Sequence, residues 1–577
     1  MRPHGRHRGV GGDQPLRRAA GALAGRTGAR ASGLRHGSGA TLTPPASRRE
    51  GERVSAPLPD VISGLLSSSA YSHAAENVEL IQTHVSYVLL AGEFAYKVKK
   101  QLDLHFLDYS TLERRRLMCE EEVRLNRRLC PDAYLGVSRI VRSGDRFIVD
   151  GEGEAVEYAV KMRRMPHERM LPGLLVSSTA TPADIARVAH VVSAFHRDAE
   201  TNDYIAGFGG VETLRTNWQE NFDQTEAQVG RTITPDERDA IRGYVKRFLH
   251  ENDALVAERA ASGRVRDCHG DLRSDSIVIR DDGSICVMDC IEFSDRIRFG
   301  DVASDVAFLA MDLEFRGRVG LADEFVAAYL GETPDETLPL VLDYYRCYRA
   351  YVRGKVEAIE SDEPEVPDAE RRAAAERARA YFALAHRYAT VRYPRTLVMM
   401  IGLSGSGKSY VAAALAGRLG AAHVSSDAVR SSVPAGAPTT PDLPYGAGGY
   451  AEAARARVYD ELHRRAERHL ELGRSVVLDA TYMRREDRIA ARRIAETSGV
   501  RFLAVEVTAA ADVVRERMTR RTDDATPSDA RWGIYLEQRR RFEPADEIAD
   551  DEIVRVNGGA PLRTSVEAVL ERLLAAE

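Results

Sequence analysis

The sequence predicts an α+β domain followed by an α/β domain whose sheet is parallel. From residue 393 to residue 577, apolar strand-like runs alternate with helix-like segments, which is typical of parallel strands joined by helical crossovers. Upstream, residues 78–165 read as short strands around one helix, and residues 181–200, 235–262, 338–360 and 368–390 read as helices. A chain of 577 residues also exceeds what one hydrophobic core usually organises.

The stretch from Leu397 to Ala416 carries the most specific motif of the chain. An apolar strand pattern ends at a glycine-rich loop with the spacing G-x4-G-K-[ST], and an alanine-rich helix pattern follows. Such a P-loop points successive N–H groups at an anion, and the new helix adds its unpaired N-terminal N–H groups. Lys408 would then reach the β- and γ-phosphates, and the hydroxyl of Ser409 would ligate Mg²⁺. The residues of the predicted ATP cradle are Gly402, Leu403, Ser404, Gly405, Ser406, Gly407, Lys408 and Ser409.

Two aspartates follow other strand patterns of the same domain. Asp427 comes directly after the run that begins at Ala422, and Asp479 ends the run that begins at Ser475. In parallel sheets ligands bind at the carboxyl ends of the strands, so both carboxylates are expected beside the P-loop. An aspartate at a strand end can also simply cap a helix, and that alternative stays open.

Arginines occupy one face of a later helix pattern. Arg517 and Arg521 are four residues apart and therefore lie on the same side of a helix. Guanidinium groups placed over a P-loop neutralise charge on a phosphoryl group in transfer. A solvated arginine face is the alternative.

The first domain brings two further carboxylates to one predicted cleft. A strand–turn–strand pattern between Ile277 and Met288 has Asp271 at its entry and Asp289 at its exit. Near a phosphoryl group two such carboxylates do different work, because one orients the acceptor hydroxyl and the other holds Mg²⁺.

These residues resemble the aminoglycoside phosphotransferase and protein-kinase-like fold. Its elements occur here in family order: Lys97 on a third strand, Glu121 or Glu122 on the next helix, the triplet His-Gly-Asp ending at Asp271, and Asp289. The resemblance implies a bilobal α+β domain in which Asp271 is the catalytic base and Asp289 binds metal. It also implies that Lys97 contacts phosphate and is paired with a helix glutamate, for which we select Glu122.

The catalytic-loop pattern departs from this family at one position. The family places asparagine, a second metal ligand, five residues after the catalytic aspartate, and this chain has Ser276 there. Asp301 and Asp305, downstream, resemble the family's aspartate-rich helix entry, and we interpret them as a loop brace and an N-cap.

The second domain resembles the polynucleotide kinase, gluconate kinase and zeta-toxin group of P-loop kinases. The spacing Ser-x-Asp-x-x-Arg carries this likeness and implies that Asp427 activates the acceptor hydroxyl while Arg430 steadies the substrate. Arg517 and Arg521 match the arginine-bearing lid of that group, and Asp479 would belong to the Mg²⁺ shell. The whole order resembles bacterial bifunctional aminoglycoside phosphotransferase/ATP-binding proteins, with a P-loop NTPase domain after the kinase-like one.

Composition sets the remaining expectations. Residues 1–57 contain eleven Arg and three acidic residues, a local charge of +8, so the other 520 residues carry −14. We interpret the tail as a disordered extension, with a transit-peptide-like or anion-binding segment as the alternative. Six cysteines without a CxxC pair predict reduced thiols in a cytoplasmic protein, and no apolar run is long enough to span a membrane. The predicted parts are 1–57, a tail; 58–355, a kinase-like domain; 356–392, a helical linker; and 393–577, a P-loop domain.

Three functions fit these patterns. In the first, both domains transfer the γ-phosphate of ATP, with Mg²⁺, to the hydroxyl group of a small molecule. In the second, only the P-loop domain is catalytic and the kinase-like domain binds a ligand to regulate it. In the third, the P-loop domain phosphorylates a nucleic-acid 5′-hydroxyl, which the acidic body disfavours.

Overall fold

The structure is a computed structural model in which residues 58–104, 107–364, 366–432, 452–523 and 532–575 are described. For residues 520–523 the backbone alone is described. The predicted tail, residues 1–57, lies outside the described residues. Within the described part no helix is long and apolar enough to cross a membrane.

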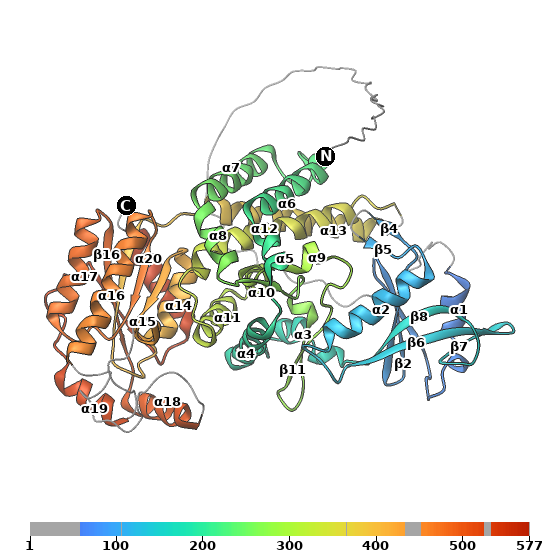
Figure 1. The fold of residues 1–577 in the computed structure, drawn as a ribbon, viewed down its shortest axis with the longest axis horizontal. Coiled ribbons are helices and arrows are strands. Elements are labelled where there is room, and N and C mark those ends of the chain that lie inside the picture. Colours follow the sequence, from blue (N-terminus) through green and yellow to red (C-terminus); the bar gives the residue numbers. More distant parts are fainter. Residues whose placement is uncertain (1–57, 105–106, 365, 433–451, 524–531, 576–577) are drawn as a thin grey trace, which may run out of the picture. The chain divides into compact units, whose positions relative to one another are not determined.

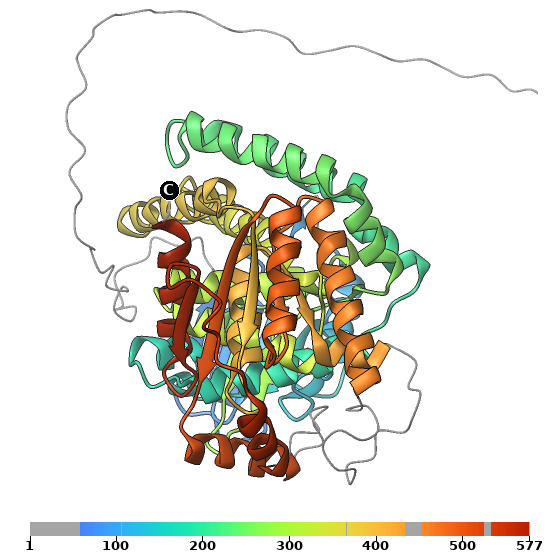
Figure 2. The ribbon, with the colours of Figure 1, turned by 90° about the vertical axis from the view of Figure 1, so that its left-hand side faces the viewer.

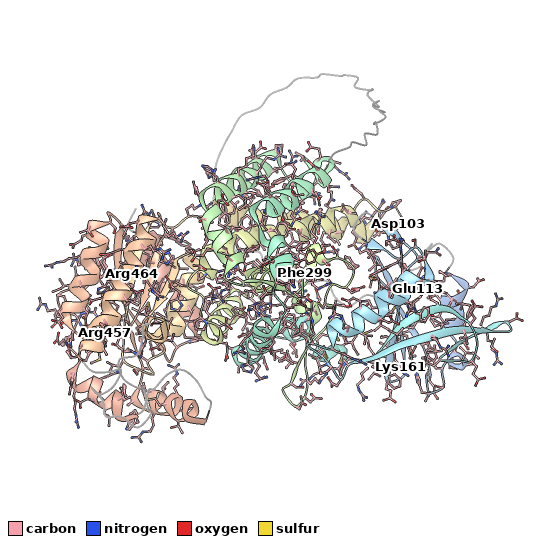
Figure 3. All side chains as sticks on the ribbon, in the orientation of Figure 1. Asp103, Glu113, Lys161, Phe299, Arg457 and Arg464 are labelled. Atoms are coloured by element: carbon pink, nitrogen blue, oxygen red, sulfur yellow. A yellow bond between two sulfur atoms is a disulfide. The ribbon has the colours of Figure 1, made fainter. Side chains whose placement is uncertain are left out.

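The N-terminal lobe is an antiparallel sheet with one long helix on it (Figure 1). The short strands predicted from residue 78 onward are present, and the neighbouring strands β1 to β3 pair in antiparallel register. The helix α2 (Leu112–Asn126) packs on β6 and β8, and Thr111 caps it by accepting the N–H of Arg114. In spatial order the strands are β1 (Glu79–Gln82), β2 (Ser86–Ala91), β3 (Phe94–Lys99), β8 (Ala155–Arg163), β6 (Tyr134–Ser143) and β7 (Arg146–Val149). Figure 3 places Glu113 on α2 and Lys161 on β8.

The second lobe is mostly helical, and its described strands form two short antiparallel pairs, β10–β11 and β12–β9. The hairpin β10–β11 is the predicted strand–turn–strand. Its helices are α3 (Leu171–Val176), α4 (Pro182–Asp198), α5 (Asp203–Ala206), α6 (Val211–Gln224), α7 (Pro235–Glu251), α8 (Asp253–Ala261), α9 (Asp295–Arg298), α10 (Val302–Phe315), α11 (Val319–Glu332), α12 (Leu338–Glu360) and α13 (Asp368–Thr390). The remaining elements of this domain are α1 (Asp60–Leu65), β4 (Asp103–Leu104), β5 (Leu107–Asp108), β9 (Val265–Asp267), β10 (Ile277–Ile279), β11 (Ile285–Val287) and β12 (Phe299–Asp301).

The P-loop domain is built on a five-stranded sheet in the order β14-β15-β13-β16-β17, and every pairing is parallel. This confirms the parallel α/β fold. Figure 2 shows the sheet with helices in front of it and behind it. The bounds are β13 (Thr396–Ile401), α14 (Lys408–Leu419), β14 (Ala422–Ser425), α15 (Ser426–Ser432), α16 (Glu452–Glu471), β15 (Val476–Asp479), α17 (Arg485–Thr497), β16 (Arg501–Thr508), α18 (Ala511–Asp523), α19 (Trp532–Arg541), β17 (Ile553–Asn557) and α20 (Leu562–Leu574).

Alternate residues of the central strands face two different cores. Leu397 and Met399 on β13 pack with residues of α16 and α17, whereas Val398 and Met400 pack with α14 and α20. On the outer side of the first core, α16 exposes charged residues such as Arg457 and Arg464 (Figure 3).

The core behind α14 continues into the helices of the other domain. Buried residues of α14, from Ala412 to Ala416, belong to the same hydrophobic cluster as Val326 of α11 and Leu342 of α12. A Cβ atom on Gly417 would lie 2.9 Å from Cγ1 of Val326, so the helices α14 and α11 approach closely. Residues on both sides of position 392 therefore form one hydrophobic core, and 52–577 is a single compact unit.

Polar contacts cross the same boundary. The hydroxyl of Tyr410, the residue directly after Ser409 of the P-loop, donates to Oε1 of Glu324 at 2.8 Å. Glu336 accepts the N–H of His423 through its carbonyl at 3.2 Å, and its carboxylate is 2.6 Å from Nε2 of His469. The segment predicted as a helical linker is helical, and α13 packs on α12 and α7.

One pair of cysteines departs from expectation. Cys130, just after α2, and Cys286, on β11, form a disulfide. The prediction of six reduced thiols is therefore wrong for these two, because the fold brings the segment after α2 against β11, 156 positions further along the chain. The other four cysteines are free and buried.

Asp323 is a buried carboxylate at the boundary between the domains. It is 3% exposed and its Oδ1 is 3.8 Å from Nη1 of Arg418, which is too far for a direct hydrogen bond. Burial raises the pKa of Asp323 to about 6 even though Arg418 and Arg346 lower it. A carboxyl whose pKa is raised on folding lowers stability progressively as pH rises from about 4 to 6.

We expect Asp323→Asn to stabilise the chain at pH 7.5, where the wild-type carboxylate is charged. The raised pKa of Asp323 corresponds to a penalty of up to about 3 kcal/mol. Melting temperatures should differ at pH 7.5 and converge at pH 4, where both side chains are neutral. The exposed residue Asp236 provides the control variant Asp236→Asn, which should melt like wild type at both pH values. A pH-independent difference for Asp323→Asn would contradict the interpretation.

Candidate functional site

The P-loop connects the central strand β13 to the first turn of α14. Gly407 is the residue before the helix and has φ of 93°, a left-handed conformation that favours glycine. A Cβ atom on Gly402 would lie 2.6 Å from the carbonyl oxygen of Val507, so only glycine fits there. The eight predicted cradle residues therefore form the expected strand–loop–helix, with Lys408 and Ser409 opening the helix.

Two buried polar atoms at the P-loop lack a hydrogen-bond partner among the described residues. They are Oγ of Ser406, on a residue that is 3% exposed, and Oδ1 of Asp479, on a residue that is 2% exposed. Burial would raise the pKa of Asp479, but His423, Lys408 and Ser409 lower it overall. Asp479 thus lies within reach of both cradle residues, and the oxygen-rich set of Ser409 and Asp479 fits a hard cation such as Mg²⁺.

Strand order places the two predicted aspartates side by side. β15, which ends at Asp479, lies between β13 and β14, and Ser425 pairs with Asp479. Asp427 follows on α15, and its Oδ1 accepts from Nη1 of Arg430 at 3.2 Å. The side chain of Asp427 is 51% exposed, so it is open to an acceptor while the arginine holds it.

Of the two arginines predicted to belong to a lid, the structure describes the side chain of Arg517 alone. Arg517 donates to the carbonyl oxygens of Ser406 at 3.2 Å and Gly558 at 2.7 Å. It therefore supports the outer side of the P-loop, and its catalytic role stays a prediction. Arg521 is on the same helix, α18, but its side chain lies outside the described residues.

Two contacts around the loop were not found from the sequence. Oε1 of Gln538, on α19, accepts the N–H of Ser404 at 2.9 Å. A Cβ atom on Gly558, after β17, would lie 1.9 Å from the carbonyl oxygen of Ser406, so only glycine is tolerated at that position. Neither residue belongs to a local motif, so spacing gives no signal for them. His423, whose Nε2 is 3.5 Å from Oδ2 of Asp479, was also missed.

In the N-terminal domain the predicted lysine joins two carboxylates. Nζ of Lys97, on β3, donates to Oε1 of Glu122 at 2.9 Å and to Oδ1 of Asp289 at 2.8 Å. Glu122 on α2 is therefore the partner rather than Glu121, which pairs with Arg124. The charge of Lys97 lowers the pKa of Asp289, and the negative charge of Asp271 opposes this effect. The carboxylates of Asp271 and Asp289 are therefore close enough to interact, and their catalytic roles stay a prediction.

A second lysine on the same strand supports this arrangement. Nζ of Lys99, almost fully buried, donates to Oε2 of Glu122 at 2.7 Å and also pairs with Glu292. The hydroxyl of Tyr109 donates to Glu292 as well. Lys99 and Glu292 are 193 residues apart, which is why the sequence did not link them.

A buried aspartate, Asp305, holds the backbone of the His269-Gly270-Asp271 triplet. Asp305, which is fully buried, accepts the backbone N–H groups of His269 at 2.7 Å and Gly270 at 3.1 Å. The side chain of Asp301 caps α10 by accepting the N–H of Ala303. A loop brace and an N-cap are thus both present, but the roles are exchanged relative to the predicted order, because Asp305 is the brace and Asp301 is the N-cap.

Asp271 is paired with an arginine two residues further on. Nε and Nη2 of Arg273 donate to the two carboxylate oxygens of Asp271 at 3.1 and 3.2 Å. Burial would raise the pKa of Asp271, but Arg273, together with Arg353, lowers it. Ser276 is 5% exposed, and its hydroxyl donates to the carbonyl of Arg273.

Two family models match the chain. A model described as the phosphotransferase enzyme family matches residues 119–340, and a model described as an AAA domain matches residues 397–545. These matches agree with the two kinase-type domains expected from the motifs.

The chain is also similar to bacterial proteins along its sequence or in its fold. It is 32% identical over 470 residues to the uncharacterized protein Rv2004c of Mycobacterium tuberculosis H37Rv, covering 80% of this chain and 90% of the relative. The uncharacterized protein Mb2027c of Mycobacterium bovis matches to the same extent. Among solved structures, a choline/ethanolamine kinase family protein from Mesorhizobium loti is 12% identical, with a TM-score of 0.35, over 55% of this chain and 94% of that one. The APS kinase CysC of Mycobacterium tuberculosis is 21% identical, with a TM-score of 0.24, over 32% of this chain and 100% of that one.

Proposed function

The chain belongs to the same family as the uncharacterized mycobacterial proteins, and because it joins two kinase-type domains we propose that it is a bifunctional ATP-dependent phosphotransferase. Each domain would transfer the γ-phosphate of ATP to a hydroxyl group of a small molecule. Mg²⁺ would neutralise charge on the phosphates at both sites.

The observation that supports this proposal most is the P-loop cradle with its aspartate. Lys408 and Ser409 open α14 beside the buried Asp479, and the unpaired oxygens of Ser406 and Asp479 need partners that a nucleotide and its cation would supply. Asp427, on the neighbouring strand end, would accept the proton of the acceptor hydroxyl while Arg430 orients the substrate. Arg517 and Arg521 would stabilise the transferring group.

The N-terminal domain supports a second ATP site. Lys97 is already paired with Glu122, so an ammonium group is fixed where phosphate oxygens would bind. Asp289 would hold the cation and Asp271 would orient the acceptor.

A regulatory role for the N-terminal domain is the second candidate, and one observation favours it. The hydroxyl of Ser276, which would have to serve as a metal ligand, is engaged by the backbone of Arg273. A nucleic-acid acceptor is disfavoured by the net charge of −14 on residues 58–577.

The test is a γ-phosphate transfer screen with the full-length chain across sugars, aminoglycosides, nucleosides and oligonucleotides. The full chain is needed because the two domains share one core. We expect magnesium-dependent transfer to a small hydroxylated acceptor. If calorimetry finds no magnesium-dependent affinity for ATP or GTP, the proposal fails.

A further inference from the structure

Ser276 does not fit the role of second metal ligand. Its Oγ donates to the carbonyl oxygen of Arg273 at 2.7 Å and accepts the N–H of the same residue at 3.3 Å. A hydroxyl has one proton and two lone pairs, so a single lone pair remains on a residue that is 5% exposed. The side chain of Ser276 is also shorter than that of asparagine, and a hydroxyl already engaged by Arg273 is a poor oxygen ligand for a divalent cation.

The guanidinium group of Arg273 lies in the same loop as a fixed positive charge. Besides its two hydrogen bonds to Asp271, its Nη1 donates to Oδ2 of Asp275 at 2.6 Å. Asp275 is held in turn by Nη2 of Arg316 at 2.9 Å. Asp271 and Asp275 therefore hold the guanidinium group of Arg273 in place. The side chain is still 17% exposed, so part of it is accessible to a ligand.

The N–H groups of Arg273 that the carboxylates do not engage could donate hydrogen bonds to phosphoryl oxygens. Arginine has five N–H groups, and among the described residues the two carboxylates engage three of them. Two N–H groups remain next to the carboxylate that would orient the acceptor. Planar guanidinium groups bind phosphate oxygens in pairs and need no deprotonated ligand to hold them.

We propose that the kinase-like site works with one divalent cation and that Arg273 supplies the positive charge that a second cation would provide. This inference rests on the phosphotransferase function proposed for that domain. Asp289 is the ligand for the single cation, and Lys97 supplies a further charge on the phosphate side.

In the proposed reaction the γ-phosphoryl group of ATP moves to the acceptor hydroxyl. The bond between the γ-phosphorus and the β,γ-bridging oxygen breaks, and a bond forms between that phosphorus and the acceptor oxygen. The electron pair of the broken bond stays on ADP. The hydroxyl proton passes to the Asp271 carboxylate and then to solvent, while the guanidinium of Arg273 keeps its protons and neutralises charge on the equatorial oxygens.

The first measurement is metal stoichiometry, with Mn²⁺ as the probe and a non-hydrolysable ATP analogue as the nucleotide. Full-length Lys408→Ala is used so that only the kinase-like site is read. We expect electron paramagnetic resonance titration to give one bound Mn²⁺ per bound nucleotide. Two Mn²⁺ per nucleotide would overturn this inference alone, whereas absence of nucleotide would overturn the proposed function of the domain and the inference with it.

The second measurement separates a transition-state charge from a structural brace. ADP with aluminium fluoride mimics the transferring phosphoryl group and needs no acceptor. Arg273→Met should weaken binding of this complex about 10²- to 10³-fold and leave ADP affinity within about threefold. Equal losses for both ligands, or no loss, would overturn the proposal.

Two further variants test whether the charge of Arg273 matters and whether loss of a nearby arginine alone changes binding. Arg273→Lys retains the charge and should recover about tenfold of the lost affinity for the aluminium fluoride complex. If it recovers none while melting like wild type, the charge is not what matters and the proposal is wrong. Arg280→Met removes an arginine on the β10–β11 hairpin that pairs with Asp132, and it should bind both ligands as wild type does.

Discussion

Lys408→Ala should abolish nucleotide binding and phosphate transfer at the P-loop site while the other site keeps its nucleotide. The ammonium group of Lys408 is the cation that reaches the β- and γ-phosphates in this loop geometry. Loss of such a fixed positive charge costs about 10²- to 10³-fold in turnover. In the full chain, calorimetry with magnesium and a non-hydrolysable ATP analogue should fall from two sites to one.

The matched variant is Lys97→Met, which removes the corresponding cation of the N-terminal domain. In this variant only the P-loop site should bind nucleotide. The double variant Lys97→Met/Lys408→Ala should bind no nucleotide. Lys408 is also the sole lysine in residues 393–577, so an ATP analogue that acylates nearby lysines would report the two sites through different peptides. Two intact binding sites in Lys408→Ala would contradict the assignment of the cradle.

Asp305→Ala should destabilise the chain by about 3 to 5 kcal/mol. Its carboxylate accepts two backbone N–H groups of the catalytic loop and is 3.3 Å from Nε2 of His196. Removing it leaves these donors buried without a partner, and each unsatisfied group costs about 1–3 kcal/mol. Hydrogen exchange at His269 and Gly270 should accelerate more than exchange elsewhere, because the loop loses its brace.

The pH dependence of the same carboxylate gives an independent check. Burial would raise the pKa of Asp305, but His196, with smaller effects of His269 and Arg349, lowers it to about 2. A lowered pKa stabilises the folded chain above about pH 4, and this contribution, about 2 kcal/mol, is lost as pH falls toward 2. Wild type and Asp305→Ala should therefore differ less at pH 2.5 than at pH 7.

The control for this variant is Asp239→Ala, at an exposed position of α7. It should change stability by no more than about 0.5 kcal/mol. An Asp305→Ala chain that melts like this control would show that the brace is unimportant.

Contiguous motifs were the part of the site that the sequence could predict. The P-loop is one such motif, and both Asp427 and Asp479 could be placed from their positions at strand ends. In the other domain Lys97, Asp271 and Asp289 could be placed because the order of motifs along the chain follows the order of the fold. The sequence allowed either Glu121 or Glu122 as the partner of Lys97, and Glu122, the one selected, is the glutamate that pairs with this lysine in the structure.

Contacts between distant segments were not predictable. Lys99, Glu292 and Tyr109 meet around Glu122 only when the two lobes are assembled, and no spacing rule joins them. The disulfide between Cys130 and Cys286 has the same origin.

Short or charged strands were also missed. β17 has five residues, Ile553–Asn557, and an arginine at its centre, so its apolar signal is weak. Its place at the sheet edge is nevertheless what brings Gly558 against Ser406.

The buried alanines of α14 make the two domains difficult to separate. The buried residues Ala412 to Ala416 of α14 belong to a core that also contains residues of α11 and α12, so a polypeptide that ended near residue 392 would expose an apolar surface on each fragment. Splitting the gene would require several polar substitutions on both fragments at once. Separating the two domains would remove part of the core from each fragment, and we expect neither fragment to be stable alone without such substitutions.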